Sequence, residues 1–191
     1  MSRPIWTNTD TNRYMPAQVF DFDAPLPERL YWDASFLVHA TYPGGRYHQL
    51  CRAFLGKLST VEQTLSYVST LALDETVFTL IQLKLAEDYP EHGFWEMYRE
   101  NPETIQPHLG ELRALVERLS RDPRIQIVGQ SSDSMLTALD YMDDYSILPR
   151  DALHLTVMAR YGIACIVTTD SDFLLVNDLM IYTCNPRILA R

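Results

Sequence analysis

Cysteine is scarce in this chain of 191 residues. Cys51, Cys165 and Cys184 are the three present, an odd number, and their positions show no metal-ligand spacing. Small secreted scaffolds that depend on disulfides carry many paired cysteines, so that class of protein is a poor match. We therefore expect reduced thiols in a cytoplasmic protein.

Long apolar runs are also missing. A membrane-spanning helix needs roughly 18–20 consecutive apolar residues, and no stretch approaches that length. The first eight residues, Met-Ser-Arg-Pro-Ile-Trp-Thr-Asn, lack the apolar core of a signal peptide. Apolar residues still make up 47% of the chain, which is enough for a substantial core. We expect a folded cytoplasmic protein that does not interact with membranes.

Positive charge is in short supply. The net charge is −9, and Lys57 and Lys84 are the two lysines, so the other basic side chains are arginines. This balance argues against wrapping nucleic acid by bulk electrostatics. It remains compatible with phosphate binding through metal ions and through arginine, whose planar fork suits phosphate better than lysine does. Genome composition would produce the same arginine bias.

Several familiar catalytic motifs are absent. The chain contains no G-x-G-x-x-G or G-x-x-x-x-G-K-[ST] loop for nucleotide phosphates, no H-E-x-x-H and no C-x-x-C. Ser35 has no base near it in the sequence, so a serine hydrolase has no specific support.

The most informative stretch covers residues 148–173. Its pattern predicts a helix that begins at Pro149 and ends at Gly162, followed by a buried strand over 163–167. In open α/β sheets, ligands bind beyond the carboxyl ends of the strands. The acids that this pattern places at the helix start and the strand end are Asp151, Asp170 and Asp172.

Other acids stand at similar places. A strand over 29–34 reaches Asp33, after which Ser35 is the expected N-cap of the next helix. Asp74 and Glu75 are expected at the start of a further helix, where acids interact well with the helix dipole. Capping alone would therefore explain Asp33, Asp74 or Glu75 taken singly.

The order of the expected elements predicts an α/β fold. Helical crossovers between strands imply a three-layer α/β/α arrangement around a central, mostly parallel, twisted sheet. We expect residues 1–28 to form an extended arm and residues 29–187 a single domain with a helical insert at about 86–107. Further expected elements are a helical piece near 60–66, helices near 94–99 and 108–120, strands near 124–128 and 180–183, and a helix from Ser131 that carries Met135, Leu136, Leu139 and Met142.

The expected sheet edge would gather carboxylates. Such a cluster is stable only if it is protonated or if it holds cations, because like charges repel. Carboxylates without cysteine or clustered histidine select Mg²⁺ or Mn²⁺ over zinc. Two such ions about 3.5–4 Å apart suit phosphodiester hydrolysis. The acids predicted to converge are Asp33, Glu75, Asp151, Asp170 and Asp172.

At these residues the chain resembles the PIN-domain family, and within it the VapC-type ribonuclease toxins. The matching motifs are Tyr-Trp-Asp-Ala-Ser-Phe-Leu-Val at 31–38, Leu-Asp-Glu-Thr-Val-Phe at 73–78, Pro-Arg-Asp-Ala-Leu-His-Leu at 149–155 and Val-Thr-Thr-Asp-Ser-Asp-Phe at 167–173. The resemblance spans most of residues 29–184, and its last two motifs are the more specific. It implies a metal-dependent endoribonuclease, the toxin of a type II toxin–antitoxin system, that hydrolyses RNA phosphodiester bonds with a metal-activated water.

The resemblance also implies roles for individual residues. The acidic quartet that would hold Mg²⁺, with Mn²⁺ as a substitute, consists of Asp33, Glu75, Asp151 and Asp170, and Asp172 supports it. Asp74 competes with Glu75, but the family usually has glutamate there. Ser35 and Thr169 would support the site.

We expect RNA to contact three basic side chains, Arg46, Arg150 and His154. His154 lies one helical turn from Asp151, and its alternative role is that of a partly buried helix residue. The resemblance adds two partners besides RNA, a cognate antitoxin and a second copy of the chain.

Two alternatives remain open. One is a catalytically silent PIN-fold module that binds protein or RNA, favoured by the insert and the negative charge. The other is a TOPRIM-like or phosphatase-like phosphoryl enzyme, because Asp170-Ser171-Asp172 has a D-x-D pattern. However, Asp33-Ala34-Ser35 lacks the second aspartate of the haloacid dehalogenase type, and no upstream strand–glutamate element suits TOPRIM as well as Glu75 suits a PIN domain.

Overall fold

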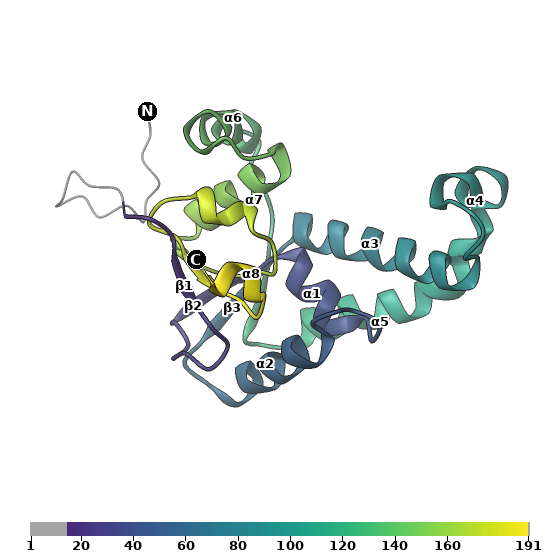
Figure 1. The fold of residues 1–191 in the computed structure, drawn as a ribbon, viewed down its shortest axis with the longest axis horizontal. Helices are drawn as coiled ribbons and strands as arrows, with labels where there is room; N and C mark the ends of the chain where they lie inside the picture. Colours follow the sequence, from purple (N-terminus) through teal and green to yellow (C-terminus); the bar gives the residue numbers. More distant parts are fainter. Residues whose placement is uncertain (1–14, 191) are drawn as a thin grey trace.

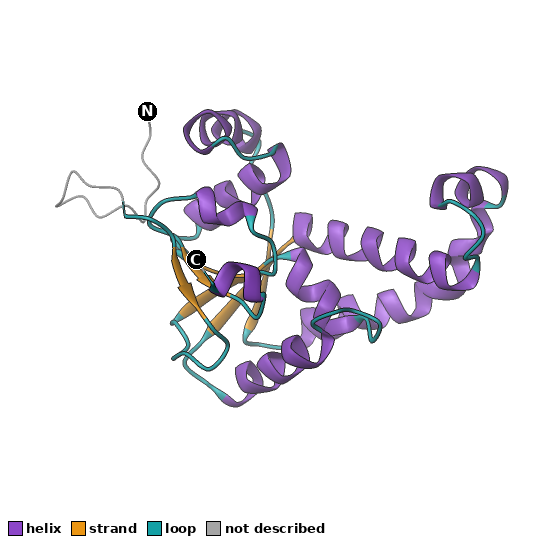
Figure 2. Cartoon of the chain, in the orientation of Figure 1, coloured by secondary structure: helices purple, strands orange, loops and turns teal. Residues whose placement is uncertain are grey.

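A sheet of six parallel strands runs through the centre of the computed structural model, which describes residues 15–190. Helices cover both faces of this sheet (Figure 1; Figure 2). The strand order is β1-β6-β5-β2-β3-β4. The strands are β1 (Gln18–Phe20), β2 (Arg29–Trp32), β3 (Leu65–Ser69), β4 (Ile125–Val128), β5 (Cys165–Val167) and β6 (Met180–Tyr182). The predicted α/β fold with a parallel sheet is confirmed.

Both faces of the sheet are buried beneath helices. Alternate residues of each strand point to opposite sides, so each strand contributes to both cores. In β2, Leu30 and Trp32 join the core beneath α1 (Ala34–Thr41), α2 (His48–Thr60) and α5 (Leu109–Arg121). Tyr31, between them, joins the core beneath α6 (Ser134–Tyr145) and α7 (Pro149–Arg160). Two short helices complete the chain, η2 (Asp172–Leu175) and α8 (Pro186–Leu189).

A helical projection extends from this layered body. Helix α3 (Thr70–Asp88) leaves the sheet beside α5, and both reach toward α4 (Phe94–Glu100) at the far end (Figure 1). The 3-10 helix η1 (Pro102–His108) connects α4 to α5. The short helix predicted near 94–99 and the helix predicted over 108–120 are both present. None of the helices within residues 15–190 is long and apolar enough to cross a membrane.

The N-terminal region contributes to the sheet. Strand β1, within the expected arm of residues 1–28, pairs in parallel with β6 at the edge of the sheet. Residues 1–14 of that arm lie outside the described residues. The division into an arm and a domain with an insert remains a prediction.

Two local predictions are wrong. Strand β3 begins at Leu65, within the stretch 60–66 that was expected to be helical. Helix α6 begins at Ser134 rather than Ser131. It buries Ala138, Tyr141 and Tyr145, whereas Met135, Leu136 and Leu139 are exposed and Met142 is partly buried. Tyr141 and Tyr145 bury more surface against the core than leucines would. The helix therefore turns this face inward, and Leu136 is 70% exposed.

Candidate active site

The order of the strands creates a switch point. From β2 the chain proceeds outward to β3 and β4, then returns to β5 on the other side of β2. Ligand sites in open α/β sheets form at such points, beyond the carboxyl ends of the strands. A cavity of about 830 Å³ lies there. Its lining includes all five expected acids, Asp33, Glu75, Asp151, Asp170 and Asp172, together with Ser35, Arg150 and His154.

Asp33 follows directly after β2 and caps α1. Its carboxylate accepts a hydrogen bond from the backbone N–H of Ser35, so the N-cap is Asp33 and the expected cap Ser35 is wrong. The Ser35 hydroxyl instead donates to Asp33 Oδ2 at 2.6 Å. Thr168 Oγ1, beyond β5, donates to the same oxygen at 2.8 Å. Asp33 is therefore buried, and its orientation is fixed by groups from two neighbouring strand ends.

Glu75 approaches the cavity from α3. That helix begins at Thr70 with Ser69 as its N-cap, so Glu75 lies in the second turn and not at the helix start. Its Oε1 lies 3.4 Å from Arg150 Nη1, and its Oε2 lies 2.8 Å from His154 Nε2. Asp74 is exposed and does not line the cavity. The geometry thus selects Glu75 over Asp74, and capping does not explain its position.

His154 is a buried member of the acidic cluster, with 1% of its surface exposed. Its Nε2 also lies 3.7 Å from Asp33 Oδ1, and its Nδ1 lies 2.6 Å from the Tyr31 hydroxyl. Burial acts to lower the pKa of His154, but the hydrogen bond to Glu75 and the nearby carboxylate charges outweigh it and raise the pKa. His154 is therefore not placed for the surface contact with RNA that the sequence suggested.

The remaining acids crowd the same cavity from α7 and from the turn after β5. Burial, followed by the charge of Asp170, raises the pKa of Asp151 to about 6. Burial also raises the pKa of Asp170, whose Oδ1 accepts a hydrogen bond from the Asp172 backbone N–H. Asp172 itself is exposed. These raised pKa values show that negative charge is unfavourable here without a counter-charge.

The donor atoms present fit a divalent cation. Asp33, Glu75 and His154 each offer one ligand atom, and these atoms lie within 4.8 Å of one another. Carboxylate oxygens suit Mg²⁺ and Mn²⁺, and imidazole nitrogen suits transition metals. A bound cation would supply the charge that the crowded carboxylates need.

Two other expected site residues lie differently. Thr169 enters through its backbone, since its N–H donates to Ser35 Oγ and its carbonyl accepts from Asn185 Nδ2. Arg46 is exposed just before α2, over the ring of Tyr47 at 5.3 Å, and does not line the cavity.

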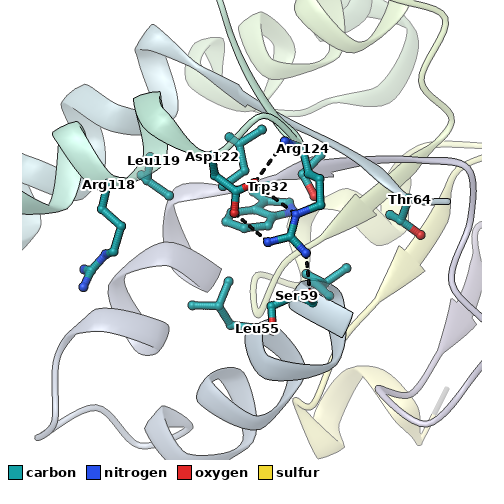
Figure 3. A pocket seen from close by; sticks show the side chains of 11 residues that line it. Trp32, Leu55, Ser59, Thr64, Arg118, Leu119, Asp122 and Arg124 are labelled. Atoms are coloured by element: carbon teal, nitrogen blue, oxygen red, sulfur yellow. Dashed lines mark hydrogen bonds and ion pairs between the residues drawn. The ribbon is translucent and has the colours of Figure 1, made fainter. Parts of the chain in front are cut away.

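A second cavity, of about 190 Å³, lies near the amino ends of β3 and β4 (Figure 3). Its one acid, Asp122, pairs with Arg124 at 2.8 Å, and Arg124 also donates to the Ser59 carbonyl. Trp32 lies behind this pair (Figure 3). Among the described residues, none of the five expected acids lines this cavity, so it offers no comparable chemistry.

Three polar residues of the site were missed from the sequence. Thr168, not Thr169, contacts Asp33 by its side chain, because alternate residues after β5 face opposite ways. The hydroxyl oxygens of Tyr31 and Ser69 lie 2.5 Å apart and form a hydrogen bond behind His154. Strand alternation could have indicated Thr168, whereas no sequence pattern links Tyr31 to His154, 123 positions away.

Comparison with known proteins agrees with this architecture. A family model described as the PIN domain matches residues 30–179. No curated protein matches the chain. The solved structure of VapC20 from Mycobacterium tuberculosis, a sarcin-ricin loop cleaving toxin, aligns with a TM-score of 0.49 and 16% identity, covering 75% of this chain and 92% of that chain.

Two further solved structures are complexes. VapBC2 from Rickettsia felis, bound to a promoter DNA fragment, has a TM-score of 0.49 and 11% identity, covering 81% of this chain and 98% of that chain. FitAcB from Neisseria gonorrhoeae has a TM-score of 0.46 and 13% identity, covering 80% of this chain and 96% of that chain.

Proposed function

Because the chain belongs to the PIN-domain family, we propose that it is a metal-dependent endoribonuclease that uses Mg²⁺ or Mn²⁺ and is the toxin of a type II toxin–antitoxin pair. One observation carries the proposal. The carboxylates of four separate segments line a single cavity at the switch point of the sheet. Membership of this family also leaves the TOPRIM-like and phosphatase-like alternatives without support.

Each residue of the cavity has a defined part in this proposal. The side chains that would hold the metal are Asp33, Glu75, Asp151 and Asp170. A metal bound there would lower the pKa of a water molecule and stabilise charge on the leaving oxygen. Ser35 and Thr168 fix the Asp33 carboxylate through their hydrogen bonds. Arg150, whose side chain is 63% exposed at the cavity, would contact an RNA phosphate.

RNA cleavage by the purified chain tests this proposal. We expect cleavage with Mn²⁺ or Mg²⁺ and none after chelation. Asp33→Asn and Asp151→Asn nearly conserve shape while each removes one ligand charge, so both should be inactive but folded. Asp74→Asn is a matched control, since Asp74 is exposed beside Glu75 on the same helix, and it should cleave normally. A parent protein that binds no divalent ion and cleaves no RNA would overturn the proposal.

We extend the proposal to partners, on the resemblance of the motifs. The chain would act in the cytoplasm, form a homodimer and bind a cognate antitoxin. Where a small protein is encoded beside this chain, co-expression of the two should give a complex that purifies intact and cleaves RNA more slowly than the free chain. Separate elution of the two proteins would contradict an antitoxin role for that neighbour.

A second candidate function is a catalytically silent binding module. The projection favours it, because Trp95 on α4 is 55% exposed and Tyr98 is 43% exposed. Exposed aromatic side chains commonly mark interaction surfaces. Metal binding without RNA cleavage, combined with loss of a partner in Trp95→Ala, would favour this module over the nuclease.

A further inference from the structure

We propose that His154 is a nitrogen ligand of the metal at this site, and that it makes the site prefer Mn²⁺ and other transition metals over Mg²⁺. This inference rests on the proposed function, which supplies the metal site. It changes the expected chemistry of that site, because the carboxylates alone would favour a hard cation such as Mg²⁺.

The position of the imidazole carries the first step. Ligands bound at about 2.1 Å on adjacent corners of an octahedron lie about 3 Å apart. His154 Nε2 lies 2.8 Å from Glu75 Oε2 and 3.7 Å from Asp33 Oδ1. The three groups therefore already stand at distances close to those of neighbouring ligands.

The second step depends on which Asp33 oxygen is already hydrogen-bonded. Its Oδ2 is committed to hydrogen bonds from Ser35 and Thr168. Its Oδ1 is the oxygen nearest His154 Nε2. This leaves one Asp33 oxygen and one imidazole nitrogen pointing at each other, with Glu75 beside them, which is the arrangement a shared cation requires.

The opposite side of the imidazole carries the third step. Metal-binding histidines usually donate their other ring N–H to a polar partner, which fixes the ring and its tautomer. His154 Nδ1 has such a partner in the Tyr31 hydroxyl at 2.6 Å, and that hydroxyl lies 2.5 Å from Ser69 Oγ. Ser69 in turn accepts from the Ala72 backbone N–H at the start of α3. The ring is thus held with Nε2 facing the carboxylates.

The chemistry of the donor decides the preference. Imidazole nitrogen binds transition metals more strongly than it binds Mg²⁺, which prefers oxygen ligands and retains its waters. Among transition metals, affinity for a nitrogen-containing site rises from Mn²⁺ to Co²⁺. Both ions should bind more tightly than Mg²⁺, because imidazole suits them and Mg²⁺ prefers oxygen. A site built from carboxylates alone would show a smaller difference.

Spectroscopy of the unmodified full-length chain tests the inference directly. Electron spin echo measurements on bound Mn²⁺, without RNA, should show coupling to a histidine nitrogen. Growth with ¹⁵N-labelled histidine should change that signal from the ¹⁴N to the ¹⁵N pattern. Tight Mn²⁺ binding without any histidine coupling would overturn the role of His154 and leave the proposed nuclease intact.

Variants identify which histidine is responsible. His154→Gln should lose the coupling and bind Mn²⁺ at least about 10-fold more weakly, because loss of a direct ligand should cost no less than loss of an outer-shell partner, while Mg²⁺ binding changes less. His39→Gln is the matched control, since His39 lines the same cavity outside the Asp33, Glu75 and His154 group, and it should keep both properties. Equal Mn²⁺ and Mg²⁺ losses in His154→Gln would overturn the preference. Absence of any Mn²⁺ binding by the parent would overturn this inference, and a parent that binds neither Mn²⁺ nor Mg²⁺ and cleaves no RNA would overturn the proposed function as well.

Discussion

The two oxygens of the Asp33 carboxylate have different surroundings. Ser35 and Thr168 donate to Oδ2 at 2.6 Å and 2.8 Å, whereas Oδ1 lies toward His154. Hydrogen bonds to one oxygen stop the carboxylate from rotating, so the other oxygen keeps its direction. In the proposed metal site, the two hydroxyls would therefore orient Asp33 toward the cation without contacting the cation themselves.

Replacing Thr168 by valine should weaken metal binding. The variant keeps the side-chain shape but loses the bond to Asp33 Oδ2 and the acceptor of the Asp170 backbone N–H at 2.9 Å. We expect a loss of roughly 10-fold in Mn²⁺ affinity by titration calorimetry, at the lower end of the effect of outer-shell partners. Thr169→Val is the control, because Thr169 bonds to Ser35 and Asn185 through its backbone N–H and carbonyl, which the substitution keeps. Equal affinities of the two variants would contradict this role of the Thr168 hydroxyl.

Asp151 should destabilise the metal-free protein at neutral pH. Its pKa is raised by burial and by Asp170 to about 6, above the usual aspartate value of 3.8. The folded state therefore favours the protonated form, and stability is lost as the pH rises from about 3.8 to about 6. In chelator, Asp151→Asn should melt at a higher temperature than the parent at pH 7.5.

The same comparison at low pH provides the check. Near pH 3 the Asp151 carboxyl is mostly protonated in both the folded and the unfolded state, so the difference in melting temperature between Asp151→Asn and the parent should shrink. Differential scanning calorimetry at the two pH values measures it. A difference that stays constant with pH would show that the charge of Asp151 is not its cause.

At the scale of single elements, the end of α7 depends on one glycine. Gly162 lies two residues after Arg160, the last residue of α7, and has a φ of +63°, a conformation that L side chains rarely adopt. Gly162→Ala should lower the free energy of unfolding by about 1–2 kcal/mol, measured by urea denaturation. This glycine lets the chain leave α7 and turn toward β5. Since α7 carries Asp151 and His154, the turn also helps to fix the position of these two site residues.

Gly56→Ala is the matched control for that variant. Gly56 lies within α2, and a Cβ added there meets nothing within 4 Å. Alanine should therefore raise the free energy of unfolding by roughly 0.5–1 kcal/mol through helix propensity. Effects of the same sign in the two variants would contradict the assignment of a left-handed conformation to Gly162.

At the scale of the whole molecule, a bound cation should stabilise the fold. The cavity is lined by segments from both sides of the sheet, so a metal that binds them all binds the folded state alone. Mn²⁺ at 100 times its dissociation constant should add about 2.7 kcal/mol to the free energy of unfolding. The melting temperature should rise with Mn²⁺ and return after chelation, whereas Asp33→Asn should show little rise. A parent melting temperature insensitive to Mn²⁺ would contradict this prediction.

Much of this architecture could be predicted from local patterns. The apolar periodicity before Gly162 and the short β-branched run after it indicated α7 and β5, and their order implied a parallel sheet. A parallel sheet places the carboxyl ends of its strands on one edge. That rule was sufficient to predict that Asp33 and Asp170 would line one cavity.

The parts that could not be predicted depend on contacts between distant segments. The burial of His154 requires Tyr31 behind it and Glu75 in front of it, and no local pattern encodes either contact. The buried face of α6 contains Tyr141 and Tyr145, which lie in the same core as the residues of α7, and it does not contain Leu136 or Leu139. The sequence of β1 has no clear apolar periodicity. This strand is stabilised by its parallel pairing with β6, a contact between segments that are far apart in the chain.

The bond between Asp33 and Thr168 joins positions 135 residues apart. Ribosomes synthesise a protein from its N-terminus, so Asp33 and Glu75 are made well before Thr168 and Asp170. Until β5 is made and inserted beside β2, the chain has neither the second wall of the cavity nor the hydroxyl that orients Asp33. If the chain cuts RNA as proposed, the nascent chain would lack a complete cavity until β5 is in place, which would spare the message and the ribosome that are producing it.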